Sequence, residues 1–240
     1  MSSQDEFGFE RNPYAAPEVR PLEPWPSAKP ELGDIDGNPF LTIWTRPRAT
    51  IRQIVARDPK QYLLPLVFLS GVGDLLDQAS IHNLGAFFSV SFLVLAALLF
   101  GFLFGLFQLL ISAFCVKFTG QMFNGRANQV ALRAAIAWAS IPAICGSILY
   151  IPEIGIFGGE TFTDAVDSFE AQPLLWIPFT IIQGTAFVLG MWSFIICCHT
   201  VAELQGYRSA WTGFWNLIFA FLVGLLLVLT PIFLLLIFSV

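Results

Sequence analysis

The chain has 240 residues, of which 56% are hydrophobic and only 12% are charged, and its formal net charge is −5. Soluble domains carry about 25% charged residues, so a water-soluble fold of this composition would expose large apolar patches. The composition therefore excludes an ordinary soluble domain and indicates an integral membrane protein. The sequence also lacks a basic groove with interleaved aromatic residues, which excludes nucleic acid as a partner.

Residues 1–39 are predicted to form a disordered cytoplasmic tail. They hold seven of the fifteen prolines and eight carboxylates. Such a stretch has too little apolar surface to offset the entropy that ordering would cost. No basic start precedes an apolar stretch here, so we do not expect a cleaved signal peptide. The first membrane span is then expected to act as the anchor.

Residues 40–60 are predicted to form an amphipathic juxtamembrane segment. Pro47 can open a helix, because the N–H that proline lacks is not needed at that position. Ile51, Ile54 and Val55 follow at the i, i+3, i+4 spacing of one helix face. We therefore expect a short helix that rests its apolar face on the inner membrane surface. Packing of this helix on the protein itself is the alternative.

Five apolar stretches follow, and each is long enough to cross a bilayer as a helix, which takes about 20 residues. The second stretch is longer than this, so it must tilt or extend beyond the membrane. The predicted fold class is all-α, a polytopic bundle of about five transmembrane helices within residues 61–240. We place the spans at residues 61–81, 87–116, 130–151, 173–199 and 212–238.

The basic residues near these spans predict the orientation. The two connections near 77–86 and 152–172 contain neither lysine nor arginine. Positive residues collect in cytoplasmic loops, so the N-terminus is expected in the cytoplasm and the C-terminus outside. Three of the twelve basic residues lie in the tail. The other nine lie in the tail's junction with the first span and in the other two loops: Arg46, Arg48, Arg52, Arg57, Lys60, Lys117, Arg126, Arg133 and Arg208.

The connection at 152–172 is expected to be a flexible outer loop, because it contains Gly155, Gly158 and Gly159. It carries five carboxylates and no base, for which simple solvation outside the membrane is the favoured explanation. A weak divalent-cation or partner site is the alternative. The five carboxylates are Glu153, Glu160, Asp164, Asp167 and Glu170.

Asp74 and Asp77 share a helix face in the outer half of the first span. An ionisable residue at membrane depth is costly and is a site candidate by default. These two aspartates are therefore the candidate pathway of a small-solute or ion transporter or channel. The favoured alternative places both at the outer membrane interface, where that cost falls steeply. Gln108 and Gln183 are the other polar residues expected at depth.

No residue pattern predicts catalysis or cofactor binding. His199 and Glu203 stand at i, i+4 spacing, but a zinc site needs more ligands than the sequence offers nearby. The four cysteines lie inside apolar runs, so we expect them to pack as small hydrophobic residues. Gly101 and Gly105 form a G-x-x-x-G spacing, which favours close helix packing inside the chain over a dimer seam.

Three stretches resemble the Yip family, membrane proteins named for interacting with Ypt/Rab GTPases. They read NPFLTIWTRPRATIRQIV at 38–55, FNGRANQVALRAAIAWASIP at 123–142 and VAELQGYRSAW at 201–211. The resemblance implies five helical spans and a cytosolic N-terminus. The Asp-Leu-Tyr-Gly-Pro signature of eukaryotic members is absent, and the chain is more similar to bacterial members. A bacterial inner membrane is therefore the expected location.

The resulting hypothesis is a non-enzymatic membrane scaffold or adaptor, with no metal or other cofactor. Its basic cytoplasmic face would bind anionic lipid or a cytoplasmic or membrane protein partner, and a second copy of the chain is left open. Attraction is worth about 1 kcal/mol per Lys or Arg close to the surface. The candidate interaction surface consists of Trp44, Arg48, Arg52, Arg57, Arg126, Glu203 and Arg208.

Overall fold

The computed structural model describes residues 37–163 and 173–238, with side chains as far as Thr230. The predicted tail lies largely outside these residues and stays a prediction. All regular elements among the described residues are helices, which confirms the all-α fold class. In chain order they are α1 Pro39–Thr45, α2 Pro47–Arg57, α3 Leu63–Ile81, η1 Leu84–Ala86, α4 Val90–Met122, α5 Gln129–Ala139, α6 Ile141–Ser147, α7 Tyr150–Phe157, η2 Gly158–Phe162, η3 Pro173–Leu175, α9 Trp176–Gln205 and α10 Ala210–Phe238.

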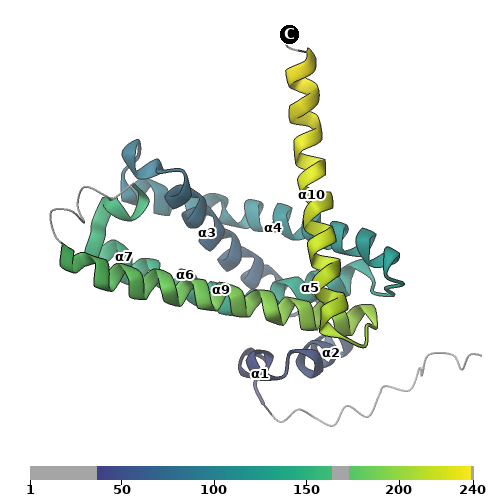
Figure 1. Cartoon of the computed structure of the whole chain (residues 1–240). Coiled ribbons are helices and arrows are strands. Elements are labelled where there is room, and N and C mark those ends of the chain that lie inside the picture. Colours follow the sequence, from purple (N-terminus) through teal and green to yellow (C-terminus); the bar gives the residue numbers. More distant parts are fainter. Residues whose placement is uncertain (1–36, 164–172, 239–240) are drawn as a thin grey trace, which may run out of the picture. The chain divides into compact units, whose positions relative to one another are not determined.

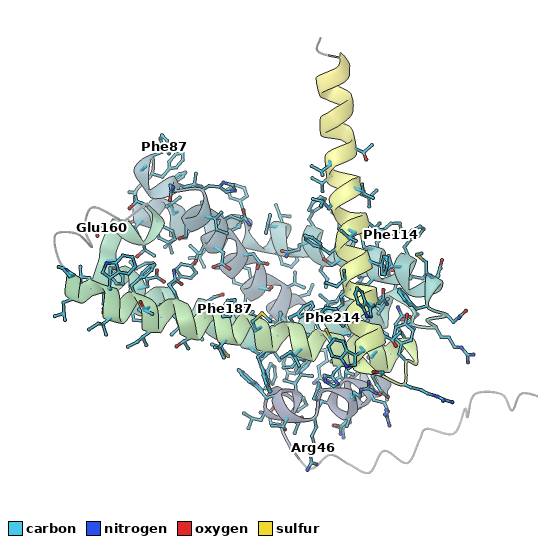
Figure 2. The ribbon with its side chains drawn as sticks, in the orientation of Figure 1. Arg46, Phe87, Phe114, Glu160, Phe187 and Phe214 are labelled. Carbon is cyan, nitrogen blue, oxygen red and sulfur yellow. The ribbon has the colours of Figure 1, made fainter. Side chains whose placement is uncertain are left out.

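Five helical stretches in the described part of the chain are long and apolar enough to cross a membrane. They are α3, α4, the stretch Ile141–Phe162, the stretch Pro173–Gln205 and α10 as far as Thr230. Much of their surface is apolar and outward-facing. Phe114 on α4 and Phe187 on α9, for example, are 54% and 69% exposed (Figure 2). Such exposure suits lipid as the surrounding solvent.

The third span differs from the predicted 130–151. The helix breaks at Ser140, because Pro142 has no N–H to donate and its ring clashes with the preceding turn. The N–H of Ala143, at the start of α6, donates instead to Ser193 Oγ of α9 at 2.8 Å. The span then continues through α7 and η2 to Phe162, so residues that we assigned to the outer loop are helical.

Helix α5, which the break separates from the third span, lies at the centre of the packing. It contacts α2, α3, α4 and α9, and Figure 1 shows α9 running beside α5 and α6. Its small residues Ala134 and Ala135 are fully buried, as is Trp138. Alanines on several faces of one helix let neighbouring backbones approach from several sides, and Trp138 fills the remaining space.

Helices α3 and α4 are in extensive contact, and glycines lie where they touch. A Cβ added at Gly71 would collide with the backbone of Gly101 and would lie 2.7 Å from the nitrogen of Gly105. A Cβ at Gly101 would lie 2.6 Å from Val72 Cγ2. The G-x-x-x-G spacing therefore serves helix packing inside the chain, which confirms the favoured prediction.

Candidate functional site

Two short helices, α1 and α2, precede the first span and are set by their caps. The side chain of Asn38 accepts a hydrogen bond from the N–H of Phe40, and Pro39 opens α1. Pro47 opens α2 in the same way. Arg46 separates the two helices, at the turn labelled in Figure 2.

The apolar face of α2 packs on the protein. Ile51 is fully buried and Ile54 is 3% exposed, and both belong to the main hydrophobic core. This core also contains Leu132 of α5 and Val201 of α9. Our expectation that this face rests on the membrane surface was therefore wrong, and the alternative, packing on the protein, is correct. The apolar residues of an amphipathic helix have the same spacing whether that face packs on protein or on lipid, so the sequence alone cannot distinguish the two.

A charged cluster fastens the polar side of α2 to the end of α9. The Nε–H of Arg52 donates to Glu203 Oε1 at 2.8 Å. Arg48 Nη1 lies 4.0 Å from Glu203 Oε2 and donates to the backbone carbonyl of Arg208 at 3.4 Å. The structure thus brings together four residues of the predicted surface, although they lie some 150 positions apart in sequence. Glu203 pairs here with two arginines of the chain.

The other residues of the predicted surface lie elsewhere. Arg57, in the last turn of α2, and Arg126, in the loop before α5, are exposed. The backbone N–H of Arg126 donates to the carbonyl of Gln205 at 3.2 Å, which fixes this loop beside the end of α9. Trp44 packs against the main core and lines a cavity with His199 of α9.

A buried polar cluster holds the ends of α4, α9 and α10 together, and sequence analysis missed it. The hydroxyl of Thr119 donates to Asn216 Oδ1 at 2.6 Å. Asn216 Nδ2 donates to Tyr207 Oη at 3.3 Å, and the Tyr207 hydroxyl donates to the carbonyl of Gly120 at 3.1 Å. Burial raises the pKa of Tyr207, so its hydroxyl stays protonated and can donate. A polar Asn216 inside an apolar helix was the available signal.

Gln205 belongs to the same region. Its Oε1 accepts from the N–H of Ala127 at 3.1 Å, and its Nε2 donates to the carbonyl of Val116 at 3.4 Å. A Cβ at Gly120 or Gly125 would collide with this side chain. The glycines and polar residues of the stretches 123–142 and 201–211 therefore serve turn packing.

Asp74 lines a cavity of about 250 Å³ between α3, α4, α5 and α9. Ser70, one turn earlier on α3, lines the same cavity. The same cavity is lined by four further polar side chains, Gln108, Ser112, Ser140 and Ser193. Asp74 thus faces the inside of the helix bundle at this cavity, and two of these polar residues, Ser140 and Ser193, flank the break that starts α6.

Asp77 lines a second, smaller cavity of about 110 Å³, which shares Ala143 with the first. The hydroxyl of Tyr150 donates to Asp77 Oδ1 at 2.6 Å. Glu153 also lines this cavity and is only 3% exposed. The prediction that Glu153 belongs to a flexible outer loop was wrong, because Tyr150–Phe157 continues the third span as α7.

The remaining acidic residues do not form a cation site in the described part of the chain. Glu160 lies in the short helix η2, and the other three predicted loop carboxylates lie outside the described residues. No group of three or more His, Cys, Asp or Glu side chains is placed to hold a metal ion among the residues described.

One comparison with known proteins gives a match. The family model of the Yip1 domain matches residues 41–230, which is most of the chain and includes α2, both aspartates, the end of α9 and the start of α10. No curated protein and no solved structure matches the chain.

Proposed function

The chain belongs to the Yip1 domain family, and from this premise we propose that it is a non-enzymatic membrane scaffold whose basic cytoplasmic face binds an acidic partner. Yip1 is not an enzyme family, and the chain is a membrane protein with several membrane-spanning helices. The proposed partner is anionic lipid or an acidic protein surface. The proposed location is a bacterial inner membrane with the N-terminus in the cytoplasm.

The observation that carries the proposal is that α2, which carries part of the basic face, is held in place by contacts with the rest of the protein. Ile51 anchors α2 in the core, while Arg52 and Glu203 fix its polar side. Exposed cations on a fixed frame lose little backbone freedom when a partner binds, so more of the attraction remains as affinity. The exposed cations at this end of the bundle include Arg57, Arg126 and Arg208.

The test is in-membrane photo-crosslinking of the full chain from position 126, with captured species identified by mass spectrometry. The proposal expects one reproducible acidic partner. A variant with the same probe and the two reversals Arg57→Glu and Arg208→Glu should capture it far less. Each charge contributes about 1 kcal/mol near an anionic surface, so two reversals remove well over ten-fold of the affinity.

The control places the same probe at His82, an exposed residue after the opposite end of α3. Capture of the same species from both positions would contradict a specific cytoplasmic face. Unchanged capture by the two-arginine variant would remove electrostatic attachment as the mechanism.

A second candidate function, transport of a small solute or ion, is favoured by the two adjoining cavities. Asp74 lines one and Asp77, which is itself exposed, lines the other, and each cavity has further polar side chains in its lining. An ionisable residue inside a membrane bundle is by default a candidate for a substrate or ion pathway.

Transport is tested by flux into vesicles that contain the purified full chain. Asp74→Asn and Asp77→Asn should each abolish a proton- or cation-dependent flux. Asp58→Asn, an exposed aspartate outside the spans, should leave it unchanged. Equal flux in all four proteins, or none above empty vesicles, would remove this candidate.

A further inference from the structure

A cavity of about 420 Å³ lies between the α1–α2 turn and α9. One wall is formed by Trp44, Arg46 and Arg48, and the opposite wall by Trp192, Ile195 and His199 of α9. Neither the scaffold proposal nor the transport candidate uses this cavity, and it is separate from those that Asp74 and Asp77 line.

The charged lining of the cavity is entirely basic. Arg46 lies at the rim and is exposed, and it makes no side-chain cap bond to α2. No carboxylate of the described residues lines the cavity. Glu203, which accepts from Arg52 at 2.8 Å, lies 4.0 Å from Arg48 Nη1 but forms no ion pair with Arg46 in the described part of the chain. The first turn of α2, with the positive end of its dipole, lies in the same wall. These features together suit a negatively charged group.

The α9 wall is apolar and continues into the lipid-facing surface. Trp192 and Ile195 are 42% and 41% exposed on a helix that crosses the membrane. His199 lies less than two turns before α9 ends at Gln205, and Trp192 less than four. The basic wall of the cavity therefore lies toward the end of α9, and the exposed apolar residues continue from it along the span.

We propose that this cavity binds one anionic phospholipid, with the phosphate-bearing headgroup against Arg46, Arg48 and His199 and the acyl chains along α9 beyond Trp192. The basic rim supplies the charge that an anionic headgroup needs, and the exposed apolar α9 surface supplies the contact for its chains. The inference rests on the proposed function in that it takes the basic cytoplasmic end as the binding face, and it names a ligand class for one edge of that face.

The test is native mass spectrometry of the purified full chain, titrated with phosphatidylglycerol and, separately, with zwitterionic phosphatidylcholine. One phosphatidylglycerol should bind with clear preference. Arg46→Gln should reduce that preference about five-fold, the value of one cation near the surface. The matched variant Lys60→Gln, which removes an exposed cation that belongs neither to the cavity lining nor to the proposed binding face, should keep it.

The apolar wall is tested by Trp192→Ala against Trp215→Ala, an exposed tryptophan on α10. Only the first should weaken binding of phosphatidylglycerol. Equal binding of the two lipids, or equal losses in the cavity and control variants, would overturn the proposal. Glycerol phosphate that competed as well as the intact lipid would also overturn it, because the acyl chains would then contribute nothing.

The two proposals fail separately. If the probe at position 126 captured no reproducible partner while the chain still preferred phosphatidylglycerol, the scaffold proposal would be removed and the lipid site supported. Partner capture that persists in Arg46→Gln while phosphatidylglycerol and phosphatidylcholine bind equally would overturn the lipid site and leave the scaffold proposal standing.

Discussion

At the scale of single residues, the contact between α3 and α4 depends on glycines, which have no Cβ atom. Gly71 has backbone atoms of Gly101 and Gly105 where its side chain would be. In a bilayer, where burial of apolar surface from water does not drive helix association, close backbone approach supplies much of the attraction between helices. Adding even one methyl group at Gly71 should therefore weaken the packing of α3 on α4.

Gly71→Ala is expected to lower the free energy of unfolding by about 1–3 kcal/mol, the usual cost of overpacking. The control is Gly184→Ala on α9, where an added Cβ meets nothing within 4 Å. Denaturation of the detergent-solubilised chain by SDS measures both. Similar stability of the two variants would show that α3 and α4 can separate without cost.

The buried polar cluster gives a second prediction at this scale. Asn216→Ala removes the bonds that its side chain makes to the hydroxyls of Thr119 and Tyr207, which keep only backbone carbonyls as partners, and should cost about 1–3 kcal/mol of stability. Thr230→Ala on the exposed part of the same helix should change stability little, because Thr230 bonds only its own helix at Leu226. The midpoints of thermal unfolding of the two variants, measured in parallel, test this difference in stability.

At the scale of elements, α2 is held by two kinds of interaction of unequal strength. The side chain of Ile51 is fully buried, whereas Arg52, with 56% of its side chain exposed, forms an ion pair at the surface. Exposed ion pairs contribute about 0–1 kcal/mol, while truncating a buried isoleucine to alanine costs about 2–5 kcal/mol. Apolar packing should therefore dominate the docking of α2, and the charged cluster should set its register.

Ile51→Ala is expected to raise amide hydrogen exchange throughout Pro47–Arg57, and Glu203→Gln to raise it only slightly. Exchange measured by mass spectrometry on the full chain in detergent micelles separates the two variants. A larger effect of Glu203→Gln than of Ile51→Ala would contradict this ranking and make the ion pair the main anchor.

At the scale of the whole molecule, the basic residues of the loops between the described spans lie at one end of the bundle. Lys60, Arg126 and Arg208 lie in connections at one end of the bundle, while the turn after α3 contains no lysine or arginine. Since basic residues are retained on the cytoplasmic side, this asymmetry predicts the orientation of every span together.

Reporter fusions test this orientation. Alkaline phosphatase, which is active only outside the cytoplasm, should be active when fused after the turn at Asn83 and inactive when fused after Ser209. A fluorescent protein that folds only in the cytoplasm should give the reverse result. Replacing Arg126, Arg133 and Arg208 by glutamine should weaken the preference, and activity after both positions would contradict a single orientation.

The sequence by itself determined that the protein lies in a membrane, that its fold is helical and that about five spans cross the bilayer. These properties depend on local length and apolarity, because lipid requires each span to satisfy its own backbone. The family was also readable from the three stretches. The position of most spans followed within a few residues, but that of the third did not.

Only the tertiary structure decided where α5 separates from the third span, what covers Ile51 and which partner Glu203 has. It also decided that Asp74 lines a cavity and that Glu153 is buried within a helix. Each of these depends on contacts between residues far apart in the chain. Apolar periodicity is the same against lipid as against a protein groove, so the local pattern carries no information about which of the two a face will meet.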